Sequence, residues 1–224
     1  MTHNDVREEP LKPGEPAPDF TLPAADREGM IALADYRGRP LLLTLMRGLQ
    51  CPFCRRNIVR LGAIAPSLRQ LGMETLAIVG TAPDRARFYF RHQPVSIRLA
   101  ADQDLFTHRR YGIACYPVTP KVRAQYRATR VDPFGELREP VPLLGPGGEE
   151  IHDVFDRLDA FVPNEIDQRD RTRQFREGLQ VCGQYMIDAA GVVRWVHVEG
   201  ADGGLSRAGI FPSETALLAA ARTV

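Results

Sequence analysis

One short segment constrains the fold more than any other. An uninterrupted apolar run, Leu41 to Met46 (LLLTLM), leads directly into RGLQ and then CPFC. Its length and continuity predict a central strand that other elements cover on both faces. After Cys54, apolar residues recur at three- and four-residue steps as far as Leu71, which predicts a helix that stops at Gly72. Pro66 inside this pattern predicts a kink, because proline cannot donate a backbone hydrogen bond.

The same alternation of strand and helix continues downstream. METLAIVG and SIRLAAD predict two further strands, with a helix from about Pro83 between them. Strands that alternate with helices indicate parallel pairing and an α/β fold. Later, GQYMIDAAGVVRWVHVEG predicts a hairpin around a tight turn, and SETALLAAARTV predicts a final helix with a Ser/Glu capping pattern.

A long segment interrupts this pattern. Residues 115–148 are rich in proline and predict irregular structure, whereas Ile151 to Phe161 and Glu165 to Glu177 predict two amphipathic helices. We therefore expect a mobile tail over residues 1–12 and one domain over residues 13–224, with an insertion at about 113–180.

Charge and the amino-terminal sequence limit the function classes. The chain has 29 basic and 28 acidic residues, so it lacks the basic field that nucleic-acid or membrane-surface partners require. MTHNDVREEP has no apolar core and does not resemble a secretory signal, which predicts the reducing cytoplasm. In that compartment four cysteines are expected to be catalytic or metal-binding rather than structural disulfides.

The candidate site is the pair Cys51 and Cys54 at the junction of strand and helix. A helix amino terminus carries about half a positive charge and unpaired N–H groups, so a thiolate is favoured there. Pro52 suits the first helical turn, and Cys54 lies one turn along, within reach of a reversible disulfide with Cys51. The nearby Arg47, Arg55, Arg56 and Arg60 would further favour an anion.

Two other interpretations of the cysteines stay open. The pair could be two buried cysteines at a helix start, or half of a zinc site to which Cys115 and Cys182 add ligands, although these lack a second knuckle spacing. The five histidines are scattered, and His197 is expected on the outer face of its strand with Arg194 or on a sheet edge. We expect no metal and no organic cofactor.

Residues 14–61, from GEPAPDF through LLLTLMRGLQCPFCRRNIVRL, resemble the peroxiredoxin-like branch of the alkyl hydroperoxide reductase and thiol-specific antioxidant superfamily. The resemblance is closest to members with an Arg-Gly-x-x-Cys-Pro-x-Cys site and covers roughly residues 13–112. It implies a thioredoxin-like fold: a central mixed sheet flanked by helices, here with a large insertion before the last two strands. It also implies attack by Cys51 on a peroxide or a disulfide.

Several positions depart from the family pattern. The usual proline and the usual threonine or serine before the reactive cysteine fall on Thr44 and Gly48, and the usual late arginine falls on Cys182. We hypothesise that Arg47 acts as the cationic partner instead. In a thioredoxin-like fold the loop that holds Cys182 faces the reactive cysteine, so Cys182 is either a third redox thiol, a wall of the site or a small core residue.

The sequence thus predicts a thiol redox enzyme. Cys51 attacks an O–O or S–S bond, Cys54 resolves the product to a disulfide, and an external thiol system such as thioredoxin or glutathione reduces it. A thiol peroxidase, a protein disulfide reductase and a non-catalytic thioredoxin-fold binding module stay as alternatives, and a homodimer stays open.

Overall fold

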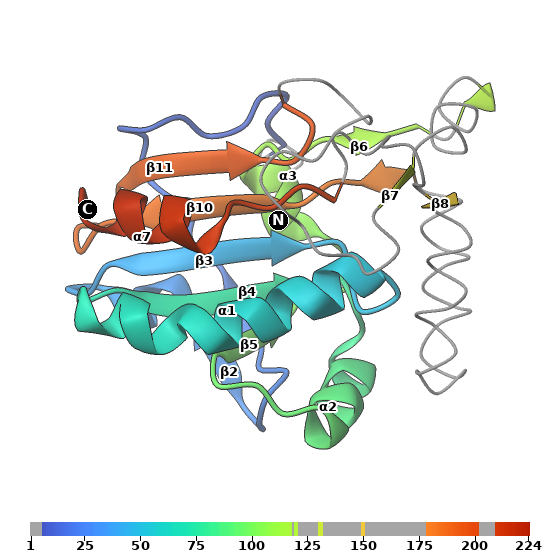
Figure 1. The fold of residues 1–224 in the computed structure, drawn as a ribbon, viewed down its shortest axis with the longest axis horizontal. Coiled ribbons are helices and arrows are strands. Elements are labelled where there is room, and N and C mark those ends of the chain that lie inside the picture. Colours follow the sequence, from blue (N-terminus) through green and yellow to red (C-terminus); the bar gives the residue numbers. More distant parts are fainter. Residues whose placement is uncertain (1–5, 118, 121–129, 132–148, 151–177, 202–208) are drawn as a thin grey trace.

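A five-stranded mixed sheet forms the centre of the computed structural model, which describes residues 6–117, 119–120, 130–131, 149–150, 178–201 and 209–224. The strand order is β11-β10-β3-β4-β5 (Figure 1). The bounds are β3 (Leu41–Met46), β4 (Glu74–Val79), β5 (Arg98–Ala101), β10 (Gly183–Ile187) and β11 (Val193–Val198). Strands β3, β4 and β5 pair in parallel, and β10 pairs antiparallel with both β3 and β11. The predicted α/β fold, its central strand and the late hairpin are confirmed.

Helices connect and cover these strands. Helix α1 (Pro52–Gln70) links β3 to β4, α2 (Pro83–His92) links β4 to β5, and the short α3 (Phe106–Arg110) follows β5. A small hairpin, β1 (Thr21–Pro23) and β2 (Met30–Ala32), precedes the 3₁₀ helix η1 (Leu33–Tyr36). The final helix, α7 (Glu214–Ala221), is capped by Ser213, whose hydroxyl accepts the N–H of Ala216. Because Ala216 occupies the position of the expected acidic partner, the capping pattern is only half formed.

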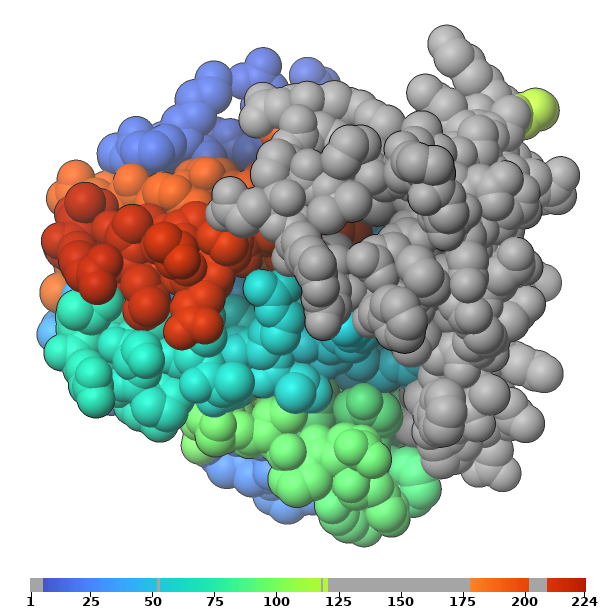
Figure 2. All heavy atoms as spheres, viewed as in Figure 1, coloured from blue at the N-terminus to red at the C-terminus, as the bar shows by residue number. Residues whose placement is uncertain are grey.

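The sheet separates two apolar layers, as the alternation of side chains along a strand requires. Leu42 and Met46 belong to the layer formed with α1, α2 and α7, and in Figure 2 helix α7 lies against α1 on that face. Leu41, Leu43 and Leu45 belong to the opposite layer, formed with η1 and the amino-terminal segment. Every residue of β3 is buried. Burial on both faces explains why this strand reads as a continuous apolar run.

Helix α1 continues through Pro66 to Gln70. Proline at this position leaves the carbonyl of Gly62, four residues earlier, without its helical donor. The hydroxyl of Ser96 donates to that carbonyl at 2.9 Å, so the buried acceptor keeps a partner. The predicted stop is confirmed, because the helix ends before Gly72, whose φ of +80° suits glycine.

The amino-terminal segment differs from the expectation of a mobile tail. Leu11 is buried in the core, and its N–H donates to the carbonyl of Tyr111 at 3.2 Å. The N–H of Arg7 likewise donates to the carbonyl of Arg109. Residues 6–12 therefore pack on the chain that follows β5, and the tail expectation is wrong for them.

The expected insertion is described only at a few places. Its two ends meet in an antiparallel pair, β6 (Cys115–Tyr116) with β9 (Leu179–Gln180), and β7 (Arg130–Val131) pairs with β8 (Glu149–Glu150). The two helices predicted over 151–177 lie outside the described residues, and the domain boundaries stay predictions. Within the described ranges, no helix has the length and apolar character needed to span a membrane.

Candidate active site

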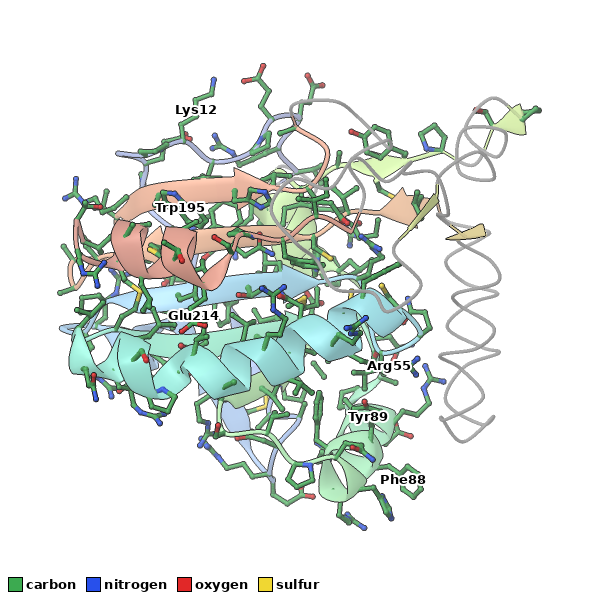
Figure 3. All side chains as sticks on the ribbon, viewed as in Figure 1. Lys12, Arg55, Phe88, Tyr89, Trp195 and Glu214 are labelled. Atoms are coloured by element: carbon green, nitrogen blue, oxygen red, sulfur yellow. The ribbon has the colours of Figure 1, made fainter. Side chains whose placement is uncertain are left out.

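The candidate residues gather at one edge of the sheet because of its strand directions. Arg47 directly follows β3 and Glu199 directly follows β11, so both lie where these strands end. Strand β10 runs antiparallel to both, which brings Cys182, just before its first residue, to the same edge. Cys51 precedes the first residue of α1 here, and Figure 3 shows Arg55 at this end of the helix. Ligand sites of α/β sheets commonly lie at this edge.

The sulfur of Cys51 is the amino-terminal cap of α1. It accepts a hydrogen bond from the backbone N–H of Cys54 at 3.4 Å and another from Arg47 Nη1 at 3.4 Å. Burial alone would raise the pKa of Cys51, but the hydrogen bond with the Cys54 side chain, the charge of Arg47 and the Cys54 N–H lower that pKa to about 6. Although its side chain is only 2% exposed, the sulfur faces polar donors and is therefore held as a thiolate near neutral pH.

Arg47 is fixed by a residue that the sequence analysis did not single out. Its Nη2 donates to Glu199 Oε2, and the two side chains are 6% and 1% exposed. Burial alone would lower the pKa of Arg47, but the carboxylate of Glu199 and the neighbouring cysteines raise it well above its ordinary value. The same carboxylate accepts the backbone N–H groups of Cys182, at 2.9 Å, and of Gly209. Glu199 therefore positions the cation that faces Cys51.

Replacing Glu199 with alanine is expected to destabilise the protein by about 3–5 kcal/mol, because it leaves the guanidinium of Arg47 buried without its counter-ion. The control is Glu74→Ala, which removes a partly exposed ion pair with Arg39 at 3.0 Å and is expected to cost about 0–1 kcal/mol. Urea unfolding measures both free energies. Equal losses for the two variants would show that the buried pair has no special role.

Gly48 shapes the loop before Cys51 and leaves no room for the threonine or serine that is usual there. Its φ is +146°, and an added Cβ would lie 2.9 Å from the carbonyl oxygen of Gly80 and against the amide oxygen of Gln50. Thr81 supports the same loop, since its hydroxyl accepts the N–H of Leu49 at 2.9 Å. This chain therefore has glycine where the family usually has threonine or serine because the loop lies too close to Gly80 and Gln50 to admit a side chain.

We expect Gly48→Ala to destabilise the fold by about 1–3 kcal/mol and to displace Cys51. A suitable control is Gly38→Ala, where φ is also positive at +82° but no atom lies within 4 Å of the added Cβ. It should cost about 1 kcal/mol through backbone strain alone. Thermal unfolding and the alkylation rate of Cys51 test this, and normal values of both for Gly48→Ala would contradict it.

Cys54 lies between the other two site cysteines. Its thiol interacts with the Cys51 side chain, and its Sγ is 3.6 Å from the Sγ of Cys182. Burial, together with hydrogen bonds to these two sulfurs, raises the pKa of Cys54 well above its ordinary value. Cys51 and Cys54 therefore differ strongly in acidity, which suits a nucleophile and a resolving thiol.

The other predicted residues differ in whether they lie at the site. Of the four arginines near the motif, Arg47 donates a hydrogen bond to the Cys51 sulfur. Cys115 is exposed in β6, and the described residues contain no group of three or more His, Cys, Asp or Glu suited to a metal ion. His197 lies on the edge strand β11, as expected, but it stacks on Trp195 rather than sharing a face with Arg194, because residues two apart share a strand face.

His108 is a second buried polar residue near the end of β3 that sequence reasoning passed over. Its Nε2 lies 3.1 Å from the carbonyl oxygen of Met46, and burial lowers its pKa to about 4. The neutral ring thus fixes the strand end that precedes Arg47. The residues next to His108 in the sequence do not indicate that its ring will be buried against the end of β3.

Sequence comparison finds peroxiredoxins among the proteins similar to this chain. Peroxiredoxin Bcp of Escherichia coli strain K12 is 26% identical over 104 residues, which cover 46% of this chain and 66% of that protein. Putative peroxiredoxin Rv2521 of Mycobacterium tuberculosis is 29% identical over 94 residues, which cover 42% and 59%. The chain thus spans less than two thirds of the length of these relatives.

Two solved structures establish the fold. The crystal structure of peroxidoxin BcpB from Mycobacterium tuberculosis has a TM-score of 0.56 at 12% identity and covers 96% of this chain and 98% of its own. The reduced 2-Cys peroxiredoxin of Plasmodium vivax has a TM-score of 0.55 at 14% identity and covers 93% and 79%. The expected thioredoxin-like fold is confirmed.

A family model, described as the AhpC/TSA family, matches residues 13–139 and so extends beyond residue 112, where the resemblance was expected to end. The match spans more than half of the chain and includes β3, the CPFC motif and α1. This protein belongs to the AhpC/TSA family.

Proposed function

We propose that this protein is a thiol peroxidase that uses Cys51 as its nucleophile and Cys54 as its resolving thiol. The observation that carries the proposal is the sulfur of Cys51, held at the start of α1 between Arg47 and the N–H of Cys54, each at 3.4 Å. A thiolate in such a position is a strong nucleophile toward an O–O bond.

The reaction proceeds in two steps. The Cys51 thiolate attacks one oxygen of a hydroperoxide, the O–O bond breaks, and the departing oxygen takes up a proton to leave as water or an alcohol. Cys51 becomes a sulfenic acid. The thiol of Cys54 then attacks the Cys51 sulfur, which releases water and gives the Cys51–Cys54 disulfide. Arg47 stabilises the negative charge of the Cys51 thiolate before it attacks the hydroperoxide.

The burial of Cys51 favours a small substrate over a protein disulfide. With 2% of the side chain exposed, a hydroperoxide can reach the sulfur far more readily than a disulfide on the surface of a folded protein. We therefore prefer a peroxidase to a protein disulfide reductase. A non-catalytic binding module would have no need for a thiol with a pKa of about 6.

The test compares two substrates with the fully reduced protein. The loss of hydrogen peroxide and the reduction of a test protein disulfide are followed at equal enzyme concentration. Faster peroxide consumption supports the proposal, and faster protein disulfide reduction would replace it with the reductase. If the wild-type protein carries out neither reaction faster than the Cys51→Ser variant does, the binding module is favoured.

The proposed cycle needs an external thiol reductant, such as a thioredoxin or glutathione system, to reduce the disulfide. Such systems operate in the cytoplasm, which we propose as the compartment. A homodimer stays a prediction, which sedimentation of the purified protein tests.

A further inference from the structure

Three of the four cysteines form one buried cluster centred on Cys54. Its Sγ lies 3.6 Å from Cys182 Sγ, and its side chain also interacts with Cys51. Cys51 is 2% exposed, and Cys54 and Cys182 are fully buried, whereas Cys115 is exposed in β6. Because a disulfide has an S–S bond of about 2.05 Å, a sulfur shift of about 1.5 Å would join Cys54 to Cys182.

The position of Cys182 is set by the residue that also fixes Arg47. The N–H of Cys182 donates to Glu199 Oε2 at 2.9 Å, and the N–H of Glu199 donates to the carbonyl of Cys182 at 2.9 Å. These two hydrogen bonds join the start of β10 to the end of β11. Glu199 therefore positions both the Cys182 sulfur beside Cys54 and the guanidinium of Arg47 beside Cys51.

The difference in acidity between Cys51 and Cys54 gives the exchange a direction. In thiol–disulfide exchange, the sulfur whose thiol has the lower pKa leaves more readily. The pKa of Cys51 is about 6, whereas burial and hydrogen bonding raise the pKa of Cys54 well above its ordinary value. If a third thiol attacks a Cys51–Cys54 disulfide at the Cys54 sulfur, the group released is the stabilised Cys51 thiolate.

We propose that Cys182 is a third redox-active thiol. It exchanges with the Cys51–Cys54 disulfide to form a Cys54–Cys182 disulfide and returns Cys51 to its thiolate form. The inference rests on the proposed function for the origin of the first disulfide. Cys182 loses its proton to solvent and its sulfur attacks Cys54 Sγ. The Cys54–Cys182 bond forms as the Cys51–Cys54 bond breaks, and the electron pair of that bond stays on Cys51. No further oxidant or reductant is needed.

This exchange, which we call the relay, leaves the disulfide between Cys54 and Cys182 and frees the nucleophile Cys51. The regenerated Cys51 can react with a second hydroperoxide before any external thiol acts, and it then stops as a sulfenic acid. A reduced chain without external reductant should therefore consume two equivalents of peroxide. A chain that lacks Cys182 should consume one, which is a twofold difference in burst amplitude.

The test uses the whole reduced protein, the variants Cys182→Ser and Cys182→Ala, and Cys115→Ser as the control for loss of a thiol outside the cluster. One set of samples receives excess hydrogen peroxide, and the burst amplitude is measured. A second set receives one equivalent of the disulfide-forming reagent diamide, which creates disulfides without any peroxidase activity. Free thiols are then alkylated in acid, and the disulfide is mapped by mass spectrometry.

The expected results are a Cys54–Cys182 disulfide with Cys51 free after diamide, and two equivalents of peroxide consumed by the wild type and Cys115→Ser against one by both Cys182 variants. A predominant Cys51–Cys54 disulfide with free Cys182, or a burst of one equivalent in the wild type, would overturn the relay while leaving the peroxidase intact. A Cys54–Cys182 disulfide in a protein that consumes no peroxide would support the relay and contradict the proposed function.

Discussion

Hydroperoxide consumption should fall on the order of a thousandfold or more when Cys51 is replaced by serine, because the hydroxyl is not ionised near neutral pH and no other thiol occupies the position between Arg47 and the Cys54 N–H. The fold should survive. Serine is a favourable helix cap, so its hydroxyl can accept the same N–H, and we expect the free energy of unfolding to change by no more than about 1 kcal/mol.

Peroxide loss in a coupled or direct assay measures this effect, with urea unfolding alongside it. Cys115→Ser is the matched control, since it removes an exposed thiol far along the chain and should leave the rate unchanged. Peroxide consumption by Cys51→Ser at the wild-type rate would assign the chemistry to another cysteine.

Replacing Arg47 with alanine should give the second-largest effect, a rate lower by on the order of 10–100-fold at pH 7. Without the guanidinium, burial dominates and the pKa of Cys51 rises from about 6 toward or above the ordinary thiol value. A thiol of pKa 6 is about 90% ionised at pH 7, whereas one of pKa 9 is about 1% ionised. The deficit should therefore shrink as the pH is raised.

The same change leaves Glu199 buried without its counter-ion, so the free energy of unfolding should also fall by about 3–5 kcal/mol. Arg47→Lys separates the two effects, because it keeps a charge but cannot contact Cys51 and Glu199 with a planar fork. Arg69→Ala, at the exposed carboxyl-terminal end of α1, controls for the loss of one arginine. A wild-type rate and pH profile in Arg47→Ala would remove Arg47 from the mechanism.

The sequence predicted the parts of the site that depend on local pattern. The run Leu41–Met46, the helix after Pro52 and the stop at Gly72 each depend on neighbouring residues alone, and the structure has all three. The proximity of Cys51 and Cys54 also follows from helix geometry, because residues three apart lie on adjacent turns.

The parts that sequence reasoning missed depend on contacts between distant segments. Glu199 lies 152 positions after Arg47, and a single acidic residue after a strand carries no signal that it will be buried against an arginine. Leu11 falls in the expected tail for the same reason, since its partner Tyr111 is 100 residues away. Only the family resemblance predicts that Cys182 lies near the site, and its contact with Cys54 comes from the pairing of β10 with β3.

The central claim is that one sulfur at the start of α1 exists as a thiolate at neutral pH. The direct measurement is the rate at which Cys51 is alkylated by iodoacetamide between about pH 4 and about pH 10, followed at that residue by mass spectrometry. We predict a half-maximal rate near pH 6 and a loss of labelling after exposure to hydrogen peroxide. A half-maximal rate near pH 9, with labelling indifferent to peroxide, would contradict the account.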